Sequence, residues 1–392
     1  MHLTPKILLE AVTVLGTVAS LCFYLLSICG LVSFLAERRR KSNHGAVQLP
    51  PVSILKPLKG VEPEIWESFC SHCEQDYPEY ELIFGVSDAA DPARDVVHKL
   101  QSAYPARAIK LVVCDRDLGT NVKVSNLAQM VAAARCEILI VNDSDIRVAS
   151  DYLRQVVAPL GEPQVGLATC LYRGVAAPTF GSRLEALTIS TDFAPGVLSA
   201  RFLEKGLGFG LGSTLAFRRQ DLAAIGGFES FLDYLADDYE LGRRIVATGK
   251  RVELSATVVD TYLPAYTLRQ FWEHQLRWSR TIRDARRWGY AGLIFTFGLP
   301  WAFAALVTAR GAAWAWALFA VTICARLLSG LGVAVGVLQD RQVLRSIVML
   351  PLRDLFAPLV WAAGLVGNRI HWRGDDFILR QGRLTRISAK SV

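Results

Sequence analysis

The chain has 392 residues, of which 52% are hydrophobic, a high fraction for a soluble protein. The apolar residues concentrate towards both ends and leave an ordinary globular composition between them, which disfavours a helical membrane bundle throughout and favours a globular domain tied to a bilayer. The formal net charge of +7 suits an anionic lipid surface or an anionic small substrate, and no basic stretch interleaved with aromatic residues indicates nucleic-acid binding.

The N-terminal segment predicts a membrane anchor. Residues 7–36 carry one charge, Glu10, and exceed the roughly 20 residues that a spanning helix needs. The run is also too long for the apolar part of a secretory signal peptide. The basic residues that follow at 38–41 indicate a cytoplasmic flank. We therefore predict an anchor at 1–37 and a basic cytosolic linker at 38–49.

The central region predicts an α/β domain with a mostly parallel sheet. Short apolar runs alternate with helical patterns such as 95–104 and 121–134, an order typical of βαβ units. Ligands of such sheets bind beyond the carboxyl ends of the strands, which indicates residues 87–91 and 142–145. The predicted strands are 52–55, 81–86, 109–113 and 137–141.

The C-terminal region predicts further membrane helices. Residues 291–309 and 312–338 each reach spanning length, and Arg326 in the second is expected to face protein or water. Residues 346–367 are apolar but contain charged residues and prolines, so a re-entrant or interfacial hairpin is expected there. The predicted divisions are a cytosolic domain at 50–288, membrane helices at 289–367 and a basic cytosolic tail at 368–392, which includes Lys390.

Two segments of the central domain leave alternatives open. Residues 182–207 are apolar with few charges, and they predict either an amphipathic stretch on the membrane surface or a buried helix. Residues 206–212 alternate glycine with apolar residues but do not match a phosphate-binding G-x-G-x-x-G loop, so a flexible rim or a close backbone approach is expected. The eight cysteines include one isolated C-x-x-C pair, Cys70 and Cys73, which does not predict zinc; reduced core cysteines fit a cytosolic domain.

Carboxylates at the predicted strand ends are candidates for chemistry. Asp143 and Asp145 follow the fourth strand, and two carboxylates on one turn can hold Mg²⁺ or Mn²⁺ together with substrate phosphates. Asp88 follows the second strand, where it either caps a helix or contacts a nucleotide. Asp237 and Asp238 precede a helical stretch, where they either complement the helix dipole or supply a general base for an acceptor hydroxyl.

Basic and aromatic residues supply further candidates. Lys123 stands near a helix start and either binds a phosphate or is solvated. Arg277 and Trp278 begin a helix side on which arginines recur every three residues up to Arg286. That side predicts either an interfacial helix with arginines on lipid phosphates, or a helix that places Arg277 on a substrate diphosphate.

Taken in order, these segments resemble the ceramide glucosyltransferase family, whose signature is D, D, D, (Q/R)xxRW. The matching residues are 52–60, Asp88, Asp143, Asp237–Asp238 and Arg277–Trp278, and the Trp-Arg-Gly at 372–374 is similar too. His274 stands where the signature has Gln or Arg, with Gln275 beside it. Family members may have Gly at the position of Asp145, which leaves Asp143, Asp145 or both as the metal ligand.

The resemblance implies a GT-A-type fold and inverting transfer of glucose or an N-acetylhexosamine from a UDP-sugar to a lipid hydroxyl. The acceptor would be ceramide or a hopanoid lipid, the cofactor a divalent cation, and the catalytic domain would lie on the cytoplasmic face of the membrane. The alternatives are a processive polysaccharide synthase and an inactive nucleotide- or lipid-binding membrane protein. The implied roles are the base for Asp238, donor binding for Asp88, Lys123, Asp143 and Arg277, and the acceptor side or closing helix for Asp237, His274, Gln275 and Trp278.

Overall fold

The computed structural model describes residues 5–41 and 49–387, so linker residues 42–48 and Lys390 lie outside the described part. The chain divides into two units, each built from separate stretches of sequence. The helical unit comprises Met1–Arg40, Pro178–Lys205 and Ala265–Asn368, and the sheet unit comprises Lys41–Ala177, Gly206–Pro264 and Arg369–Val392. The helical unit thus includes parts of the predicted central domain, and the sheet unit includes the predicted tail.

The sheet unit contains one mixed sheet of eight strands in the order β3-β2-β1-β4-β7-β6-β8-β5. The strands β3, β2, β1 and β4 run parallel, whereas β7 is antiparallel to both of its neighbours. This mixed and mostly parallel sheet confirms the predicted fold class. The strands are β1 (Val52–Leu58), β2 (Tyr80–Val86), β3 (Ala108–Val113), β4 (Ile138–Val141), β5 (Ile146–Arg147), β6 (Val165–Val175), β7 (Leu215–Arg218) and β8 (Arg251–Tyr262).

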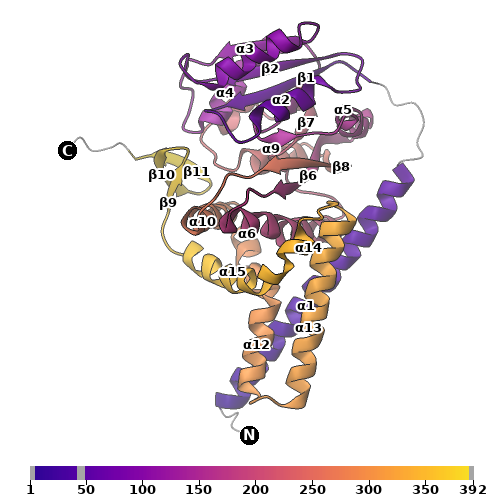
Figure 1. Cartoon of the computed structure of the whole chain (residues 1–392), viewed down its shortest axis with the longest axis vertical. Coiled ribbons are helices and arrows are strands. Elements are labelled where there is room, and N and C mark those ends of the chain that lie inside the picture. The colour runs from indigo at the N-terminus through magenta and orange to yellow at the C-terminus, as the bar shows by residue number, and fades with distance from the viewer. Residues whose placement is uncertain (1–4, 42–48, 388–392) are drawn as a thin grey trace, which may run out of the picture. The chain divides into compact units, whose positions relative to one another are not determined.

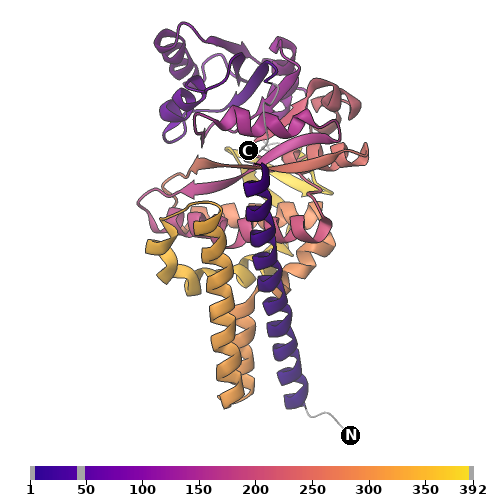
Figure 2. The same ribbon diagram turned by 90° about the vertical axis from the view of Figure 1, so that its right-hand side faces the viewer.

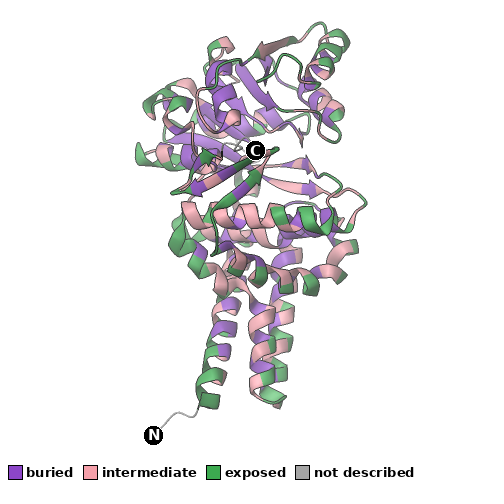
Figure 3. Ribbon diagram, turned by 90° about the vertical axis from the view of Figure 1, so that its left-hand side faces the viewer, coloured by how far each residue is buried: buried purple, intermediate pink, exposed green. Residues whose placement is uncertain are grey.

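The apolar runs become strands because the sheet has covered faces. Every residue of β1, β2 and β4 is buried, which fits strands that pack on both sides, and Figure 3 shows the buried strands beside exposed outer helix faces. Phe69 of α2 packs against Phe84 of β2 with ring centroids 4.6 Å apart. The helices of this unit are α2 (Ile65–Cys73), α3 (Ala93–Ala103), α4 (Val122–Met130), α5 (Tyr152–Val157), α8 (Arg219–Ala224) and α9 (Asp237–Ala247).

Pairing around β4 brings three chain segments to one edge of the sheet. Leu55 of β1 pairs with Val141 at the end of β4, and Val141 also pairs with Leu215 at the start of β7. The loop after β4 and the glycine-rich segment before β7 therefore lie at the same edge. This edge is where a largely parallel sheet binds its ligands.

The predicted basic tail is folded. It forms a second sheet of three antiparallel strands, β9 (Arg369–Trp372), β10 (Asp375–Arg380) and β11 (Arg383–Arg386). Their apolar side chains pack on Leu235 of the segment that precedes α9. This sheet is part of the sheet unit (Figure 1).

Among residues 5–41 and 49–387, two helices of the helical unit are long and apolar enough to cross a membrane, α1 (Pro5–Lys41) and α13 (Ala313–Gly336). A third candidate span results if the helical stretches Arg287–Thr296 and Gly298–Thr308, which meet with a bend of 53°, are counted as one. Figures 1 and 2 show α1, α12 and α13 side by side, and Ser27 and Ser329 form a 2.9 Å hydrogen bond between two of them. The other helices are α6 (Phe180–Thr188), α7 (Ala194–Glu204), α10 (Leu268–Ala285), α11 (Arg287–Gly292), α12 (Gly298–Thr308), α14 (Val343–Ser346) and α15 (Leu350–Gly364).

Arg326 of α13 faces protein, as predicted for a charge in an apolar helix. Its side chain is 3% exposed and its guanidinium lies 2.9 Å from Asp354 and 3.1 Å from Asp192. Asp192 belongs to a π-helical turn, Ile189–Phe193, between α6 and α7. Most of α6 and much of α7 are buried, which favours the buried-helix interpretation of residues 182–207 over the membrane-surface one.

Candidate functional site

The acidic loop after β4 is held by a buried polar network. The side-chain amide of Asn142 donates to the Ser213 carbonyl at 2.7 Å and to Tyr152 Oη at 2.9 Å. Lys56 of β1 is fully buried and its Nζ donates to the Asp143 carbonyl at 2.9 Å. Burial lowers the pKa of Lys56 to about 7, and the carboxylates around it oppose that shift.

Lys123 joins two of the predicted carboxylates. Its Nζ lies 2.8 Å from Asp143 Oδ1 and 3.1 Å from Asp237 Oδ2, and only 10% of its side chain is exposed. The Asn121 side chain caps α4 by accepting from the Val124 amide, which fixes the helix start that carries Lys123. Burial alone would lower the pKa of Lys123, but the facing carboxylates raise it above its ordinary value. Lys123 is therefore a fixed cation between the acidic loop and α9.

Asp238 occupies the first turn of α9, where the Tyr239 amide donates to its Oδ1 at 2.7 Å. Removal from water raises the pKa of Asp238 to about 6, Asp237 adds to the rise, and Lys123 opposes it. A carboxylate whose pKa approaches neutrality while it stays ionised near pH 7 has the properties of a general base.

The glycine-rich segment brings Asp143 and Asp238 to one space. A Cβ atom added to Gly212 would lie 3.3 Å from Asp238 Oδ2 and 3.6 Å from Asp143 Oδ2. Both carboxylates therefore border the volume that this glycine leaves open. Farther back, a Cβ on Gly242 of α9 would come within 2.3 Å of the Gly210 nitrogen, so the expected close backbone approach is confirmed.

Asp145 and Asp88 have different surroundings. Asp145 is half-buried and accepts a hydrogen bond from Thr261 of β8. Removal from water raises its pKa to about 7, and Glu62 and Asp143 add to the rise. Asp88 is exposed, and its Oδ1 accepts from the Ala90 amide at 2.8 Å within its own loop.

The predicted closing residues lie in the helical unit, on α10. His274 Nδ1 lies 3.0 Å from one oxygen of Glu185, and the Gln275 amide donates to the other oxygen at 2.8 Å. Glu185, on α6, is fully buried. Trp278 packs against His274 and Phe193, with centroid distances of 5.1 and 5.8 Å. Glu185 thus fixes two of the four predicted residues on this helix.

Arg280 and Arg283 of α10, and Arg286 directly after it, also bond to protein groups. Arg280 donates to the Val366 carbonyl at 3.0 Å, and Arg283 donates to the Gly364 carbonyl at 2.7 Å. Arg286 donates to Glu204 at 2.8 Å. These arginines connect α10 to the end of α15 and to α7.

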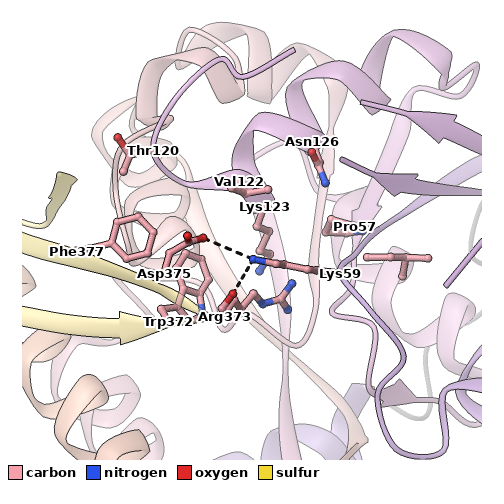
Figure 4. A pocket seen from close by; sticks show the side chains of 11 residues that line it. Pro57, Lys59, Thr120, Val122, Lys123, Asn126, Trp372, Arg373, Asp375 and Phe377 are labelled. Carbon is pink, nitrogen blue, oxygen red and sulfur yellow. Dashed lines mark hydrogen bonds and ion pairs between the residues drawn. The ribbon is translucent and has the colours of Figure 1, made fainter. Parts of the chain in front are cut away.

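Sequence reasoning missed several residues of the site. Lys56 and Glu62 flank the acidic loop only after β1 pairs with β4, and Glu185 stands 89 residues before His274. Trp372 and Arg373 were noted in the sequence only as similar to the family, with no role, and they line a small cavity with Lys59 and Lys123 (Figure 4). Among the described residues, no three His, Cys, Asp or Glu side chains are grouped so as to hold a metal ion by themselves. A cation here would need ligands from a substrate.

Known proteins resemble this chain over most of its length. The profile of the family described as Glycosyl transferase family 21 matches residues 12–385. Ceramide glucosyltransferase 3 of Caenorhabditis elegans is 24% identical over 386 residues, which cover 95% of this chain and 82% of the relative. Ceramide glucosyltransferase of Komagataella phaffii is 32% identical over 154 residues, which cover 37% of this chain and 30% of the relative.

Among solved structures, the mannosyltransferase PcManGT of Pyrobaculum calidifontis, in complex with GDP-Man and Mn²⁺, has a similar fold. The TM-score is 0.50 with 19% identity, over 91% of this chain and 97% of that one. The likeness confirms the GT-A-type fold.

Proposed function

The chain belongs to glycosyl transferase family 21, and from that premise we propose that it transfers a sugar from a UDP-sugar to a lipid hydroxyl with inversion at the anomeric carbon. The observation that carries this proposal is the convergence of Asp143 and Asp238 on the space beside Gly212, with Lys123 fixed between Asp143 and Asp237. The similar Caenorhabditis and Komagataella proteins are named ceramide glucosyltransferases, which supports a ceramide acceptor. A hopanoid acceptor has the same hydroxyl chemistry and is the second candidate.

The acidic loop fits a divalent cation. Lys123 pairs with Oδ1 of Asp143, and Oδ2 of the same carboxylate borders the space at Gly212. Asp145, two residues later, adds a second carboxylate. Mg²⁺ and Mn²⁺ accept one or two carboxylates when substrate phosphates complete the shell. Asp143 and Asp145 would hold the cation, which when bound neutralises the diphosphate leaving group.

Asp238 is proposed as the general base. It would accept the proton of the acceptor hydroxyl while that oxygen forms a bond to the anomeric carbon and the bond from this carbon to the diphosphate breaks. One displacement inverts the anomeric carbon and needs no second carboxylate as nucleophile, in contrast to retention through a covalent intermediate. The rise in the pKa of Asp238 supports this role.

The helical unit would bind the acceptor lipid and anchor the chain in the membrane. Arg277 is proposed as a ligand of phosphate oxygens and Trp278 as a contact of the acceptor lipid, with His274 and Gln275 held by Glu185. The candidate spans would place the chain in a bilayer, and the basic residues 38–40 at the C-terminal end of α1 favour a cytoplasmic sheet unit. The described residues provide at most three candidate spans, which fits transfer of a single sugar better than threading of a polymer.

The deciding experiment incubates membranes that contain the chain with labelled UDP-sugars, extracted lipids and Mg²⁺ or Mn²⁺, and identifies labelled lipids by mass. Asp238→Asn should abolish transfer and largely preserve UDP-sugar binding. Asp76→Asn is the matched control, because its exposed side chain pairs with Arg154 outside the carboxylate cluster. Turnover by Asp238→Asn at the wild-type rate would remove Asp238 from the base role, and no labelled lipid with any donor would refute the lipid acceptor.

A further inference from the structure

The C-terminal sheet, β9 to β11, is attached to the segment that leads into the catalytic carboxylates. The Leu384 amide donates to the Asp233 carbonyl at 2.7 Å, and the Leu235 amide donates to the Gly382 carbonyl at 3.0 Å. Leu235 also packs in the apolar core of this sheet. Since Asp237 follows two residues later, the C-terminal sheet and the start of α9 share one support.

The same segment holds the start of α4, which carries Lys123. The Asn121 amide donates to the Leu232 carbonyl at 2.8 Å, and its side chain donates to the Tyr234 carbonyl at 2.7 Å. The Thr120 amide donates to Asp233 Oδ1 at 2.9 Å. The segment 232–235 therefore connects the C-terminal sheet to α4 through direct hydrogen bonds on both sides.

A cavity lies between the end of β1, the start of α4 and the first hairpin of the C-terminal sheet (Figure 4). The hairpin crosses to β1 through Lys59, whose Nζ donates to the Arg373 carbonyl at 2.7 Å and lies 3.7 Å from Asp375. Arg373 in turn lies 3.6 Å from Glu62, beside the acidic loop. The lining residues are Pro57, Leu58, Lys59, Thr120, Val122, Lys123, Asn126, Trp372, Arg373, Asp375 and Phe377.

The lining has the chemistry of a nucleotide site. It combines three cations with two aromatic rings, those of Trp372 and Phe377, at the carboxyl end of a parallel strand. Arginine and lysine bind phosphate oxygens, and an aromatic face stacks on any base. Lys59 follows β1 and Lys123 belongs to α4, and the folded C-terminal sheet adds Arg373 to them, together with Asp375, which pairs with Lys59.

From this arrangement, and resting on the proposed function, we propose that the hairpin Trp372–Asp375 is a wall of the donor site, with Trp372 against the base and Arg373 on the diphosphate. The space between the lining side chains is about 20 Å³, room for about one water. Entry of a nucleotide therefore requires the partly exposed side chains of Lys59 and Arg373 to leave this space and move onto the phosphate oxygens. The hairpin then covers the bound donor, and its side chains no longer occupy the cavity that the donor enters.

The two hairpins of the C-terminal sheet provide a matched pair of variants. Arg373 and Gly374 form a two-residue turn with φ angles of 51° and 90°, and Gln381 and Gly382 form another with 52° and 77°. Asparagine suits the first position of such a turn. Arg373→Asn therefore removes the guanidinium and keeps the turn, and Gln381→Asn makes the same backbone change at an exposed position outside the cavity.

The test measures UDP binding by calorimetry on the full-length chain in detergent micelles, together with donor and acceptor KM and kcat. Trp372→Ala and Arg373→Asn should each raise the Kd for UDP and the donor KM by about tenfold. Acceptor KM and kcat at saturating donor should change by less than about threefold, and Gln381→Asn should match the wild type. Trp372→Phe, which keeps an aromatic face, should recover most of the affinity.

The outcomes separate this proposal from the proposed function. A wild-type chain that binds UDP, with Arg373→Asn and folded Trp372 variants binding it equally well, overturns the hairpin proposal and leaves the transferase proposal standing. A wild-type chain that binds no UDP overturns the donor assignment and the hairpin proposal with it. Should Trp372→Ala lower the thermal unfolding temperature, Trp372→Phe and Arg373→Asn decide the question.

Discussion

Replacing Lys123 by methionine tests whether the carboxylate cluster depends on one cation. Lys123 lies 2.8 Å from Asp143 and 3.1 Å from Asp237, and its side chain is 10% exposed. Removing one partner of a buried ion pair costs about 3–5 kcal/mol because the remaining charge loses its compensation. Asp143 is 35% exposed and water can solvate it in part, so about 3 kcal/mol is expected.

For a unit of this size, about 3 kcal/mol corresponds to a fall of roughly 6–12 °C in unfolding temperature. The assay is thermal unfolding of the full-length chain in detergent at pH 7, with transferase activity measured in parallel. Lys123→Arg keeps the charge and should lose less stability. Adding Asp237→Asn to Lys123→Met removes an unpaired carboxylate and should recover part of the loss, since paired residues show non-additive effects. A Lys123→Met chain that unfolds within about 1 °C of the wild type would refute the reasoning.

Three further predictions concern the same two units. Because Asp238 must be ionised to accept a proton and its pKa is raised to about 6, kcat should be full above that pH and fall as pH drops through it; a kcat–pH profile that is flat from pH 5 to 8 would contradict this. Gly212→Val should lower kcat at least tenfold without loss of folding, because its side chain would fill the space beside Asp143 and Asp238; circular dichroism and initial rates measure the two effects. Glu185→Leu should lower the stability of the helical unit by about 1–3 kcal/mol, since the side chains of His274 and Gln275 would both lose their buried hydrogen-bond partner; an unchanged unfolding temperature would show that the buried carboxylate is dispensable.

Three of the four strands that the sequence predicted, β1, β2 and β4, are fully buried, whereas β3 is only partly buried. Residues 52–55, 81–86 and 109–113 lie in β1 to β3, and 138–141 of the predicted 137–141 form β4. The remaining strands were not predicted because polar residues interrupt their apolar runs. In β8, for example, buried and partly exposed positions alternate irregularly over 12 residues. The insertion of the antiparallel β7 between β4 and β6 depends on pairings far apart in the chain, which no local pattern reveals.

The sequence of the C-terminal sheet contains a local pattern typical of β-hairpins, but the prediction for this segment followed its basic charge instead. Apolar residues recur with a period of two around Ile370, Phe377 and Leu379, and each of the two hairpins has a glycine as the second residue of a two-residue turn. The many arginines predicted a solvated cytosolic tail. Their side chains are exposed, however, and say nothing about the apolar residues on the buried face. The buried face determined the fold.

The individual carboxylates were identifiable from their places at strand and helix ends, but their partners were not. The sequence predicts either a phosphate ligand or a solvated lysine at position 123, and the structure contradicts the second, because Lys123 is paired with Asp143 and, across 114 residues of sequence, with Asp237. That contact exists because the segment 232–235 bonds to the start of α4 on one side and to the C-terminal sheet on the other. A substitution in this segment should therefore change donor affinity and the environment of Asp238 together, because one short stretch of backbone supports the hairpin Trp372–Asp375, Lys123 and the start of α9.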